Sequence, residues 1–405
     1  MRIIIITDQF PPNHFGGMAQ HAYHISKFLG RQHEVAVLLP STMGVSRHGG
    51  EGFSLVPLLS MKHPRLDAWR AARFARKFRP DVIHVCTAGM AYETLLNKYP
   101  FVVRVVGNDF LRPWVGPGLP FRRIVNRVTF GAAKQWFQKV ETMNRKRIAL
   151  RQLRQADVIV ANSDWTAQRL VEERIHPERI RRVVGGLNSE HFSESHNRAG
   201  LRELLGFSPD DFVCLTAGNL IGKKGFDTVM RAIALLKEQG NCRMRYVILG
   251  DGPEEPALRA QGKISGIEDQ VIYAGRKTQH ELARYYQAGD LYVQISRDHL
   301  LPNGFWDVET MGRTYFEAGA CGIPVIASRV GGVPSVVLHG INGLLINDPE
   351  DAHEVAASIR RLMDDSKLRR DLGLAGLRLA RDEFSWERVG EQFERALLDA
   401  KHLRA

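Results

Sequence analysis

Two glutamates in the C-terminal half of the chain, Glu309 and Glu317, stand eight positions apart in the stretch ETMGRTYFE. Carboxylates accept hydrogen bonds, so a pair of them near one ligand suits the vicinal hydroxyls of a sugar. Within a single helix, an eight-residue step turns about 800° and rises about 12 Å, which keeps the two side chains out of one small site. Two solvated surface charges are the simpler alternative.

The position of the helix start decides whether the two carboxylates can cooperate. A helix that begins near Arg313 or Thr314 leaves Glu309 in the preceding loop and Glu317 on the first turn. Both glutamates can then face a ligand whose phosphate lies on the free amides of residues 311–314.

Two glycine-containing loops offer further backbone amides to a phosphate. The stretch DQFPPNHFGGMAQHAYHISKFL leads through Gly16 and Gly17 into a helix, whose N-terminus favours negative charge. In LTAGNLIGKKGFDTV a strand ends at Gly218, and Lys223 and Lys224 follow before a helix. Alternatively, the glycine pair only forms a turn, and the two lysines are only solvated. Neither loop is a G-x-G-x-x-G or Walker sequence, which disfavours a dinucleotide-dependent oxidoreductase and a P-loop NTPase.

Positive charge is concentrated between residues 121 and 154, where ten basic residues occur with a single acid, Glu141, and with aromatic residues among them. A basic, partly aromatic helix fits contact with an anionic bilayer that carries a lipid-linked acceptor. A solvated basic face fits equally well, and nucleic acid is disfavoured because no recognition motif accompanies the charge. The residues are Arg122, Arg123, Arg127, Lys134, Lys139, Arg145, Lys146, Arg147, Arg151 and Arg154, with Phe130, Trp136 and Phe137.

The composition is that of a two-domain globular protein with a net charge of +12. A chain of 405 residues exceeds what one hydrophobic core usually organises. No run of about 18 apolar residues could span a bilayer. The start, MRIIIITDQFPP, reads as a first strand and not as a signal peptide, so we expect a cytoplasmic protein.

The four cysteines are scattered through the chain and form no C-x-x-C or His-rich cluster. This spacing disfavours both a disulfide framework and a zinc site, and we expect no metal. The cysteines are Cys86, Cys214, Cys242 and Cys321.

Short apolar runs alternate with helix-length segments in both halves, which is typical of parallel strands buried on both faces. The runs are RIIIIT, EVAVLLP, DVIHVC, FVVRVV and DVIVANS, then FVCLTAG, RYVILGD, QVIYAG, LYVQIS, PVIAS and GLLIN. They predict two doubly wound α/β domains, residues 1–190 and 191–383. Residues 384–405 read as an amphipathic helix that packs back on the first domain. Ligands of such sheets bind at the carboxyl ends of the strands, and we expect the site to draw on both domains.

These motifs together resemble the family 4 retaining glycosyltransferases of GT-B architecture, in which two Rossmann-like domains face each other across a cleft. In the second half the resemblance rests on the E-x7-E spacing with EAGACGIPVIASRVGGVP, GINGLLIND, GNLIGKKGFDTV, YVILGDGPE and AGDLYVQIS. In the first half it rests on DQFPPNHFGGMAQHAYHISKFL, PDVIHV and ADVIVANSDWTAQRL. It covers nearly the whole chain.

The resemblance implies transfer of a hexose-type sugar from a nucleoside diphosphate sugar to an acceptor hydroxyl, with retention and without a metal or other cofactor. Glu309 matches the glutamate that contacts donor-sugar hydroxyls, Glu317 the one that holds the ribose, and Lys224 the lysine that binds the diphosphate. Gly16 and Gly17 match the glycine loop beside the phosphates. The remaining donor-site residues implied are Gly218, Asn219, Met311, Gly312, Arg313 and Thr314.

Three positions depart from the family pattern. Asn219 replaces an arginine beside the diphosphate, Val106 replaces a histidine at a strand end, and Ser335 replaces a glutamate after GGVP. Asn108 or Asp109 could restore the lost polar contact, so Asp109 joins Glu309 and Lys224 as a candidate catalytic residue. The departures keep a non-catalytic nucleotide-sugar-binding protein open as an alternative. A nucleotide-sugar epimerase is a second alternative. For the glycosyltransferase, the expected role lies in cell-surface polysaccharide or glycolipid assembly.

Overall fold

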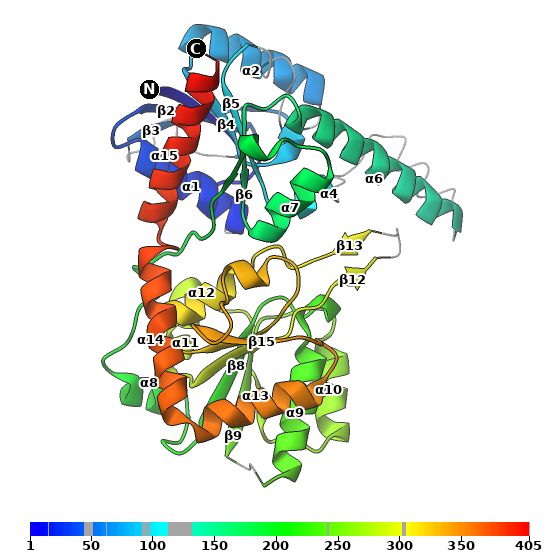
Figure 1. Cartoon of the computed structure of the whole chain (residues 1–405), viewed down its shortest axis with the longest axis vertical. Helices are drawn as coiled ribbons and strands as arrows, with labels where there is room; N and C mark the ends of the chain where they lie inside the picture. Colours follow the sequence, from blue (N-terminus) through cyan, green and yellow to red (C-terminus); the bar gives the residue numbers. More distant parts are fainter. Residues whose placement is uncertain are drawn as a thin grey trace. The chain divides into compact units, whose positions relative to one another are not determined.

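The computed structural model (Figure 1) shows a chain organised as two compact units. The first unit comprises Met1–Gly186, Leu300–Thr310 and Trp386–Ala405, and the second comprises Leu187–His299 and Met311–Ser385. The structure describes residues 1–14, 16–43, 52–61, 63–90, 95, 98–111, 132–240, 243–301 and 305–404. Of the basic segment, Arg122, Arg123, Arg127 and Phe130 lie outside the described residues, as does Cys242.

The first unit is built on a seven-stranded parallel sheet in the order β3-β2-β1-β4-β5-β6-β7. The central strand β4 and its neighbour β1 are buried almost throughout, as expected for a parallel sheet covered on both faces. The strands are β1 (Arg2–Ile6), β2 (Glu34–Pro40), β3 (Phe53–Leu59), β4 (Val82–Val85), β5 (Phe101–Val105), β6 (Val158–Ala161) and β7 (Ile180–Arg182). The apolar runs predicted five of these strands and missed β3 and β7.

Helices cover both faces of this sheet. On one face, α1 (Gly17–Leu29) and α15 (Trp386–Leu403) pack against Ile3 and Ile5 of β1. On the other face, α2 (Pro64–Phe78), α6 (Ala132–Leu153) and α7 (Asp164–Glu172) pack against Ile4 and Ile6. The alternation of β1 residues between the two cores follows from the two-residue period of a strand. Shorter elements are α4 (Asn108–Leu111), η1 (Ala88–Met90) and η2 (Pro177–Arg179).

The second unit is built on a six-stranded parallel sheet in the order β10-β9-β8-β11-β14-β15. All six apolar runs predicted for this half are strands: β8 (Phe212–Ala217), β9 (Met244–Leu249), β10 (Val271–Tyr273), β11 (Leu291–Gln294), β14 (Val325–Ser328) and β15 (Gly343–Ile346). Two such sheets confirm the predicted pair of doubly wound α/β domains. A separate two-stranded ribbon joins β12 (His299–Leu300) and β13 (Trp306–Asp307).

The helices of the second unit form two sets, which meet where α13 (Ala352–Asp364) contacts α14 (Ser366–Asp382). One set is α9 (Phe226–Glu238), α10 (Glu255–Ile264) and α13. The other is α8 (Arg198–Leu204), α11 (Gln279–Ala288), α12 (Arg313–Ala320) and α14. The 3-10 turns are η3 (Gly222–Lys224) and η4 (Val333–Ser335). Among the helices of the described chain, none is long and apolar enough to cross a bilayer.

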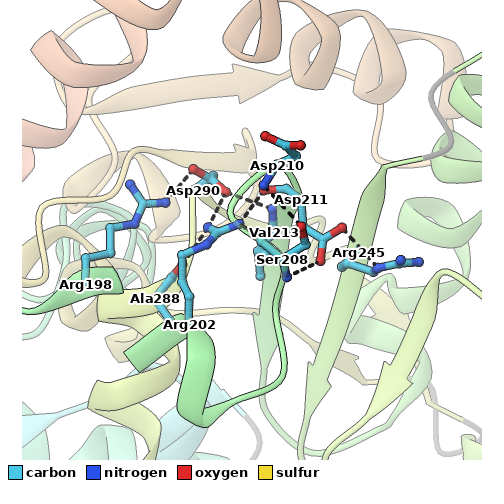
Figure 2. A network of polar contacts seen from close by, with 9 residues as sticks. All are labelled: Arg198, Arg202, Ser208, Asp210, Asp211, Val213, Arg245, Ala288 and Asp290. Carbon is cyan, nitrogen blue, oxygen red and sulfur yellow. Dashed lines mark hydrogen bonds and ion pairs between the residues drawn. The ribbon is translucent and has the colours of Figure 1, made fainter. Parts of the chain in front are cut away.

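An ionic network fixes the second sheet at the amino ends of β8 and β11 (Figure 2). Asp290, directly before β11, accepts hydrogen bonds from the Val213 amide (2.9 Å) and from Arg198 (2.5 Å). The buried guanidinium of Arg202 donates to four oxygens: Ala288 O (3.1 Å), Ser208 O (2.8 Å), Asp211 O (2.5 Å) and Asp290 Oδ2 (3.1 Å). Ligands bind at the carboxyl ends of such strands, so this network stabilises the fold and leaves the opposite edge free for chemistry.

Candidate functional site

The loop after β8 brings two of the predicted donor-site residues together. Gly218 follows the last residue of β8, and a Cβ on it would lie 3.7 Å from Lys224 Cε. Gly225 ends η3 with φ of 67°, and a Cβ there would lie 1.8 Å from Ile295 O, so only glycine fits. This close approach presses η3 against the end of β11 and holds the Lys224 side chain beside Gly218. Asn219, next in the loop, is exposed.

The second cluster of predicted residues lies at the start of α12. The helix begins at Arg313, which confirms the predicted start. Gly312 has φ of 85°, and a Cβ on it would lie 2.3 Å from Tyr315 Cε2. This glycine therefore allows the chain to turn tightly into the helix over the Tyr315 ring. The first amides of α12 have no acceptor within the helix and carry partial positive charge, as an anion site requires. Met311 and Gly312 are buried, and Thr314 is half-buried.

Glu317 is the fifth residue of α12, one residue beyond the first turn on which we predicted it. Its side chain is 7% exposed and forms an ion pair with Arg313, with Oε1 3.2 Å from Nη2. Burial raises the pKa of the Glu317 carboxyl, and the neighbouring Arg313 offsets part of this rise. A carboxylate in such a poorly solvated position is a strong acceptor for hydroxyl groups.

Glu309 belongs to the first unit, because the boundary between the two units falls between Thr310 and Met311. Glu309 is half-buried. The neighbouring Thr310 accepts a hydrogen bond from Asn162 Nδ2 (3.4 Å), and its methyl group lies 2.7 Å from the position of a Cβ on Gly107. The E-x7-E motif thus places its two carboxylates on different units.

The other predicted residues of the first unit lie at the carboxyl ends of its strands. Gly16 caps α1, and it and Gly17, the first residue of the helix, are exposed. Asp109 accepts hydrogen bonds from the amides of Val106 (3.0 Å) and Ala88 (3.2 Å), and from Thr87 Oγ1 (3.4 Å). Burial raises the pKa of the Asp109 carboxyl. Its contacts link the loops that follow β4 and β5.

A His-Cys cluster that the sequence did not reveal lies in the core of the first unit. His84 and Cys86 share one face of β4 and its extension because they are two positions apart. His21 of α1 approaches them, with its Nε2 3.2 Å from His84 Nε2, and Cys86 Sγ lies 3.7 Å from the same atom. His84 Nδ1 donates to Val102 O (3.3 Å).

The ligand atoms of His21, His84 and Cys86 lie within 4.8 Å of one another, and imidazole and sulfur are donor types that metal ions accept in proteins. Burial lowers the pKa of His84 to about 3 and raises the pKa of the Cys86 thiol to about 12. In the metal-free protein these side chains are therefore uncharged and form a hydrogen-bonded cluster in the core. Cys86, Cys214 and Cys321 are free and buried.

Two family models match the chain in tandem. The model of the Glycosyltransferase Family 4 domain matches residues 15–191, and the model described as Glycosyl transferases group 1 matches residues 197–378. The chain belongs to the family 4 glycosyltransferases of GT-B architecture.

Two relatives of this glycosyltransferase carry the names of glycosyltransferases themselves. It is 25% identical to the GDP-mannose-dependent alpha-(1-6)-phosphatidylinositol monomannoside mannosyltransferase of Mycolicibacterium smegmatis, over 99% of this chain and 100% of the relative. It is 32% identical to the D-inositol 3-phosphate glycosyltransferase of Streptomyces bingchenggensis, over 58% of this chain and 51% of the relative.

A solved structure supports the fold of this glycosyltransferase. The crystal structure of Anabaena Alr3699/HepE in complex with UDP and glucose superposes with a TM-score of 0.71. The alignment covers 98% of this chain and 99% of the other, with 20% sequence identity. At this identity the likeness shows the architecture alone.

Proposed function

We propose that this glycosyltransferase moves a hexose-type sugar from a nucleoside diphosphate sugar to a hydroxyl of a sugar or lipid-linked acceptor. In this proposal the anomeric configuration is retained and no metal ion is needed. The observation that carries the proposal is the arrangement in the second unit, where Lys224 lies beside Gly218 and α12 begins with free amides and a buried Glu317. The Lys224 ammonium group and the amides suit a diphosphate, and the Glu317 carboxylate suits the hydroxyls of a ribose.

The diphosphate is bound by the Lys224 ammonium group and by the amides of residues 311–314. Negative charge develops on the leaving phosphate as the bond to the sugar breaks, and a preorganised cation with helix amides stabilises that charge. Asn219 can donate one hydrogen bond there but lacks the bidentate fork of the arginine usual at this position. The loss of this contact is the observation that favours a non-catalytic binding protein.

The sugar step is a substitution on one face of the ring. The bond between the anomeric carbon and the leaving phosphate oxygen breaks, while the acceptor oxygen bonds to the same carbon on the same side. The acceptor proton passes to the departing phosphate oxygen. Glu309 accepts hydrogen bonds from donor-sugar hydroxyls, and Asp109 positions the loops after β4 and β5 through its three contacts.

A lipid-linked acceptor would bring the protein to the inner face of an anionic membrane, with α6 as the first contact. Trp136 and Met143 of α6 are 60% and 41% exposed, and the basic Lys139 and Arg147 are exposed on the same helix. Not every basic residue of the segment is available, because Arg145 pairs with Glu141 and Lys146 pairs with Glu173.

Helix α2 packs on the same face of the first sheet as α6 and also exposes basic and apolar side chains. Trp69 and Leu66 are 52% and 39% exposed, and Arg73 and Arg76 are exposed beside them. The helix carries a single acid, Asp67, which is 1% exposed and accepts hydrogen bonds from the amides of residues 60 and 61. Exposed aromatic residues with unopposed basic charge suit the headgroup region of an anionic bilayer.

The test of the donor site is the Lys224→Ala variant, titrated calorimetrically with GDP and with UDP. A charged hydrogen bond contributes about 1.5 to 3 kcal/mol, so we expect nucleotide affinity to fall about 10- to 160-fold. Lys223→Ala, one position away, is the matched control and should bind like the wild type. Equal binding by both variants would remove Lys224 from the site.

Measuring consumption of the donor sugar, with and without an acceptor, separates the proposed transferase from a binding protein and from an epimerase. A non-catalytic protein binds the donor sugar without consuming it, and an epimerase converts the donor without any acceptor. The proposed enzyme releases a nucleoside diphosphate from its donor.

A further inference from the structure

A group of polar side chains lies inside the second unit, where an α/β core is normally apolar. Gln294, the last residue of β11, is completely buried, and so are Tyr292, Ser296 and Tyr315 to within 1%. Burying an amide or a hydroxyl without a partner costs stability, so each of these groups must find one inside the protein.

Gln294 uses all of its hydrogen-bonding capacity within this group. Its Nε2 donates to Ser296 Oγ (2.9 Å) and to Tyr315 Oη (3.0 Å). Its Oε1 accepts from Tyr292 Oη (2.8 Å) and from Thr314 Oγ1 (3.5 Å). A fully satisfied buried network holds its members in one arrangement. Gln294 is thus a fixed junction between β11 and the start of α12.

The same junction reaches the loop after β8. The Tyr292 hydroxyl, which donates to Gln294, lies 3.2 Å from Ala217 O and accepts from the Ala217 amide (3.4 Å). Ala217 directly precedes Gly218, and a Cβ on Gly218 would lie 3.9 Å from Gln294 Oε1. Gln294 therefore lies against the loop that holds Lys224.

On the other side, the network supports the turn into α12. Tyr315 accepts from Gln294, and its ring is the surface over which Gly312 turns into the helix. Thr314, the second residue of α12, bonds directly to Gln294. The amides proposed to bind phosphate therefore rest on the same side chain as the Gly218 loop.

We propose that Gln294 is a positioning residue for the donor diphosphate, which fixes the Gly218 loop and the first amides of α12 relative to each other. The inference rests on the proposed function, since it concerns the same donor site. Preorganised donors stabilise developing charge because they need no rearrangement during the reaction. Loosening the junction should therefore weaken diphosphate binding and slow transfer, beyond any effect on folding.

A matched pair of hydroxyl deletions tests this role. Tyr315→Phe removes the hydroxyl that accepts from Gln294. Tyr246→Phe, on β9, removes an equally buried hydroxyl, which donates to Thr216 Oγ1 (2.8 Å) on β8. We expect similar losses of melting temperature, but a roughly fivefold to tenfold weaker affinity for GDP or UDP and a lower kcat in Tyr315→Phe alone. Equal nucleotide affinities in the two variants would overturn the proposal.

Substitutions at Gln294 add a readout that a purely structural role would not change. Gln294→Glu places a carboxyl group directly behind the Gly218 loop and beside Thr314 at the start of α12, so nucleotide affinity should fall at least tenfold at pH 8. It should recover as the pH falls and the carboxyl takes up a proton. Gln294→Met should lose affinity without this pH dependence. Identical pH profiles for the two variants would contradict the placement.

The result for Lys224→Ala distinguishes failure of the proposed donor site from failure of the positioning role of Gln294. If Lys224→Ala weakens nucleotide binding while the Tyr315 and Gln294 variants do not, the donor site stands and the role of Gln294 is refuted. If Lys224→Ala has no effect, the proposed site itself fails. Should the Gln294 variants not fold, the Tyr315 and Tyr246 pair still decides.

Discussion

The role assigned to Glu317 can be tested by removing its carboxylate and asking whether the ribose is still recognised. Glu317→Ala should weaken binding of a nucleoside diphosphate, because a hydrogen bond to a charged group contributes about 1.5 to 3 kcal/mol. The expected loss of affinity is about 10- to 160-fold. The corresponding 2′,3′-dideoxynucleotide lacks the vicinal hydroxyls, so its affinity should hardly change.

The ion pair with Arg313 complicates a single substitution. Loss of one partner of a fully buried pair costs about 3 to 5 kcal/mol of folding stability. Arg313 retains 21% exposure, so we expect about 1 to 3 kcal/mol here. Arg313→Ala also breaks the pair but keeps the carboxylate, and the double variant Arg313→Ala/Glu317→Ala completes a cycle that separates the two effects.

The assay is calorimetric titration of the four proteins with a diphosphate and with its dideoxy form. If Glu317 holds the ribose, the ratio of the two affinities collapses in Glu317→Ala and in the double variant, and persists in Arg313→Ala. A ratio that survives in Glu317→Ala would refute the assignment. Glu309→Ala, in contrast, should keep the affinity for free nucleotide and lose transfer.

Three further predictions concern stability and surface contacts. The unfolded chain protonates His84 at its ordinary pKa of 6.5 and the folded chain only at about 3, so the free energy of unfolding should fall as the pH falls through this window. In urea unfolding from pH 6.5 to 4, His84 should contribute about 1.4 kcal/mol per pH unit to the slope, and His21, whose pKa is also lowered by burial, contributes in the same direction. His84→Gln should therefore reduce the slope and His402→Gln should leave it; an unchanged slope in His84→Gln would contradict the prediction. Arg202→Met breaks a pair whose side chains are 9% and 11% exposed and should cost about 3 to 5 kcal/mol, against less than about 1 kcal/mol for the exposed Arg198→Met; equal costs would refute the reasoning. Neutralising four exposed residues of α2 and α6 should weaken binding to anionic vesicles by about 10² to 10³ at low salt, whereas Arg370→Gln with Arg378→Gln on α14 should not; binding that does not distinguish anionic from neutral lipid would exclude this surface. The four substitutions are Arg73→Gln, Arg76→Gln, Lys139→Gln and Arg147→Gln.

Sequence patterns predicted the fold where strands are long and apolar and failed where they are not. All six strands of the second sheet were found because each is a continuous apolar run. In the first sheet, β3 carries a serine and a proline in its run FSLVPLL, and β7 has three residues, of which two are arginines. Edge positions such as those of β3 and β7 relax the demand for apolar residues, so their pattern is weak.

In the candidate site, too, some features could be predicted from the sequence and others could not. From the sequence, Glu309 and Glu317 could face one ligand only if a helix began near Arg313 or Thr314, and α12 begins at Arg313. Gln294 was missed, although polar residues at alternate positions of a buried strand, Tyr292 and Gln294, are an available signal. The partners of a side chain remain hidden when they are distant in sequence. Lys146 looked free until the fold paired it with Glu173.

The central claim, retaining transfer from a nucleoside diphosphate sugar, can be tested without knowing the acceptor. Water can take the place of the acceptor, so the purified protein is incubated with GDP-mannose or UDP-glucose in the presence of EDTA. Proton NMR then records the anomer of the free sugar before it equilibrates. The account predicts that the α-anomer appears first, together with GDP or UDP, and that Lys224→Ala abolishes its release. The β-anomer appearing first, or no diphosphate released from either donor, would contradict it.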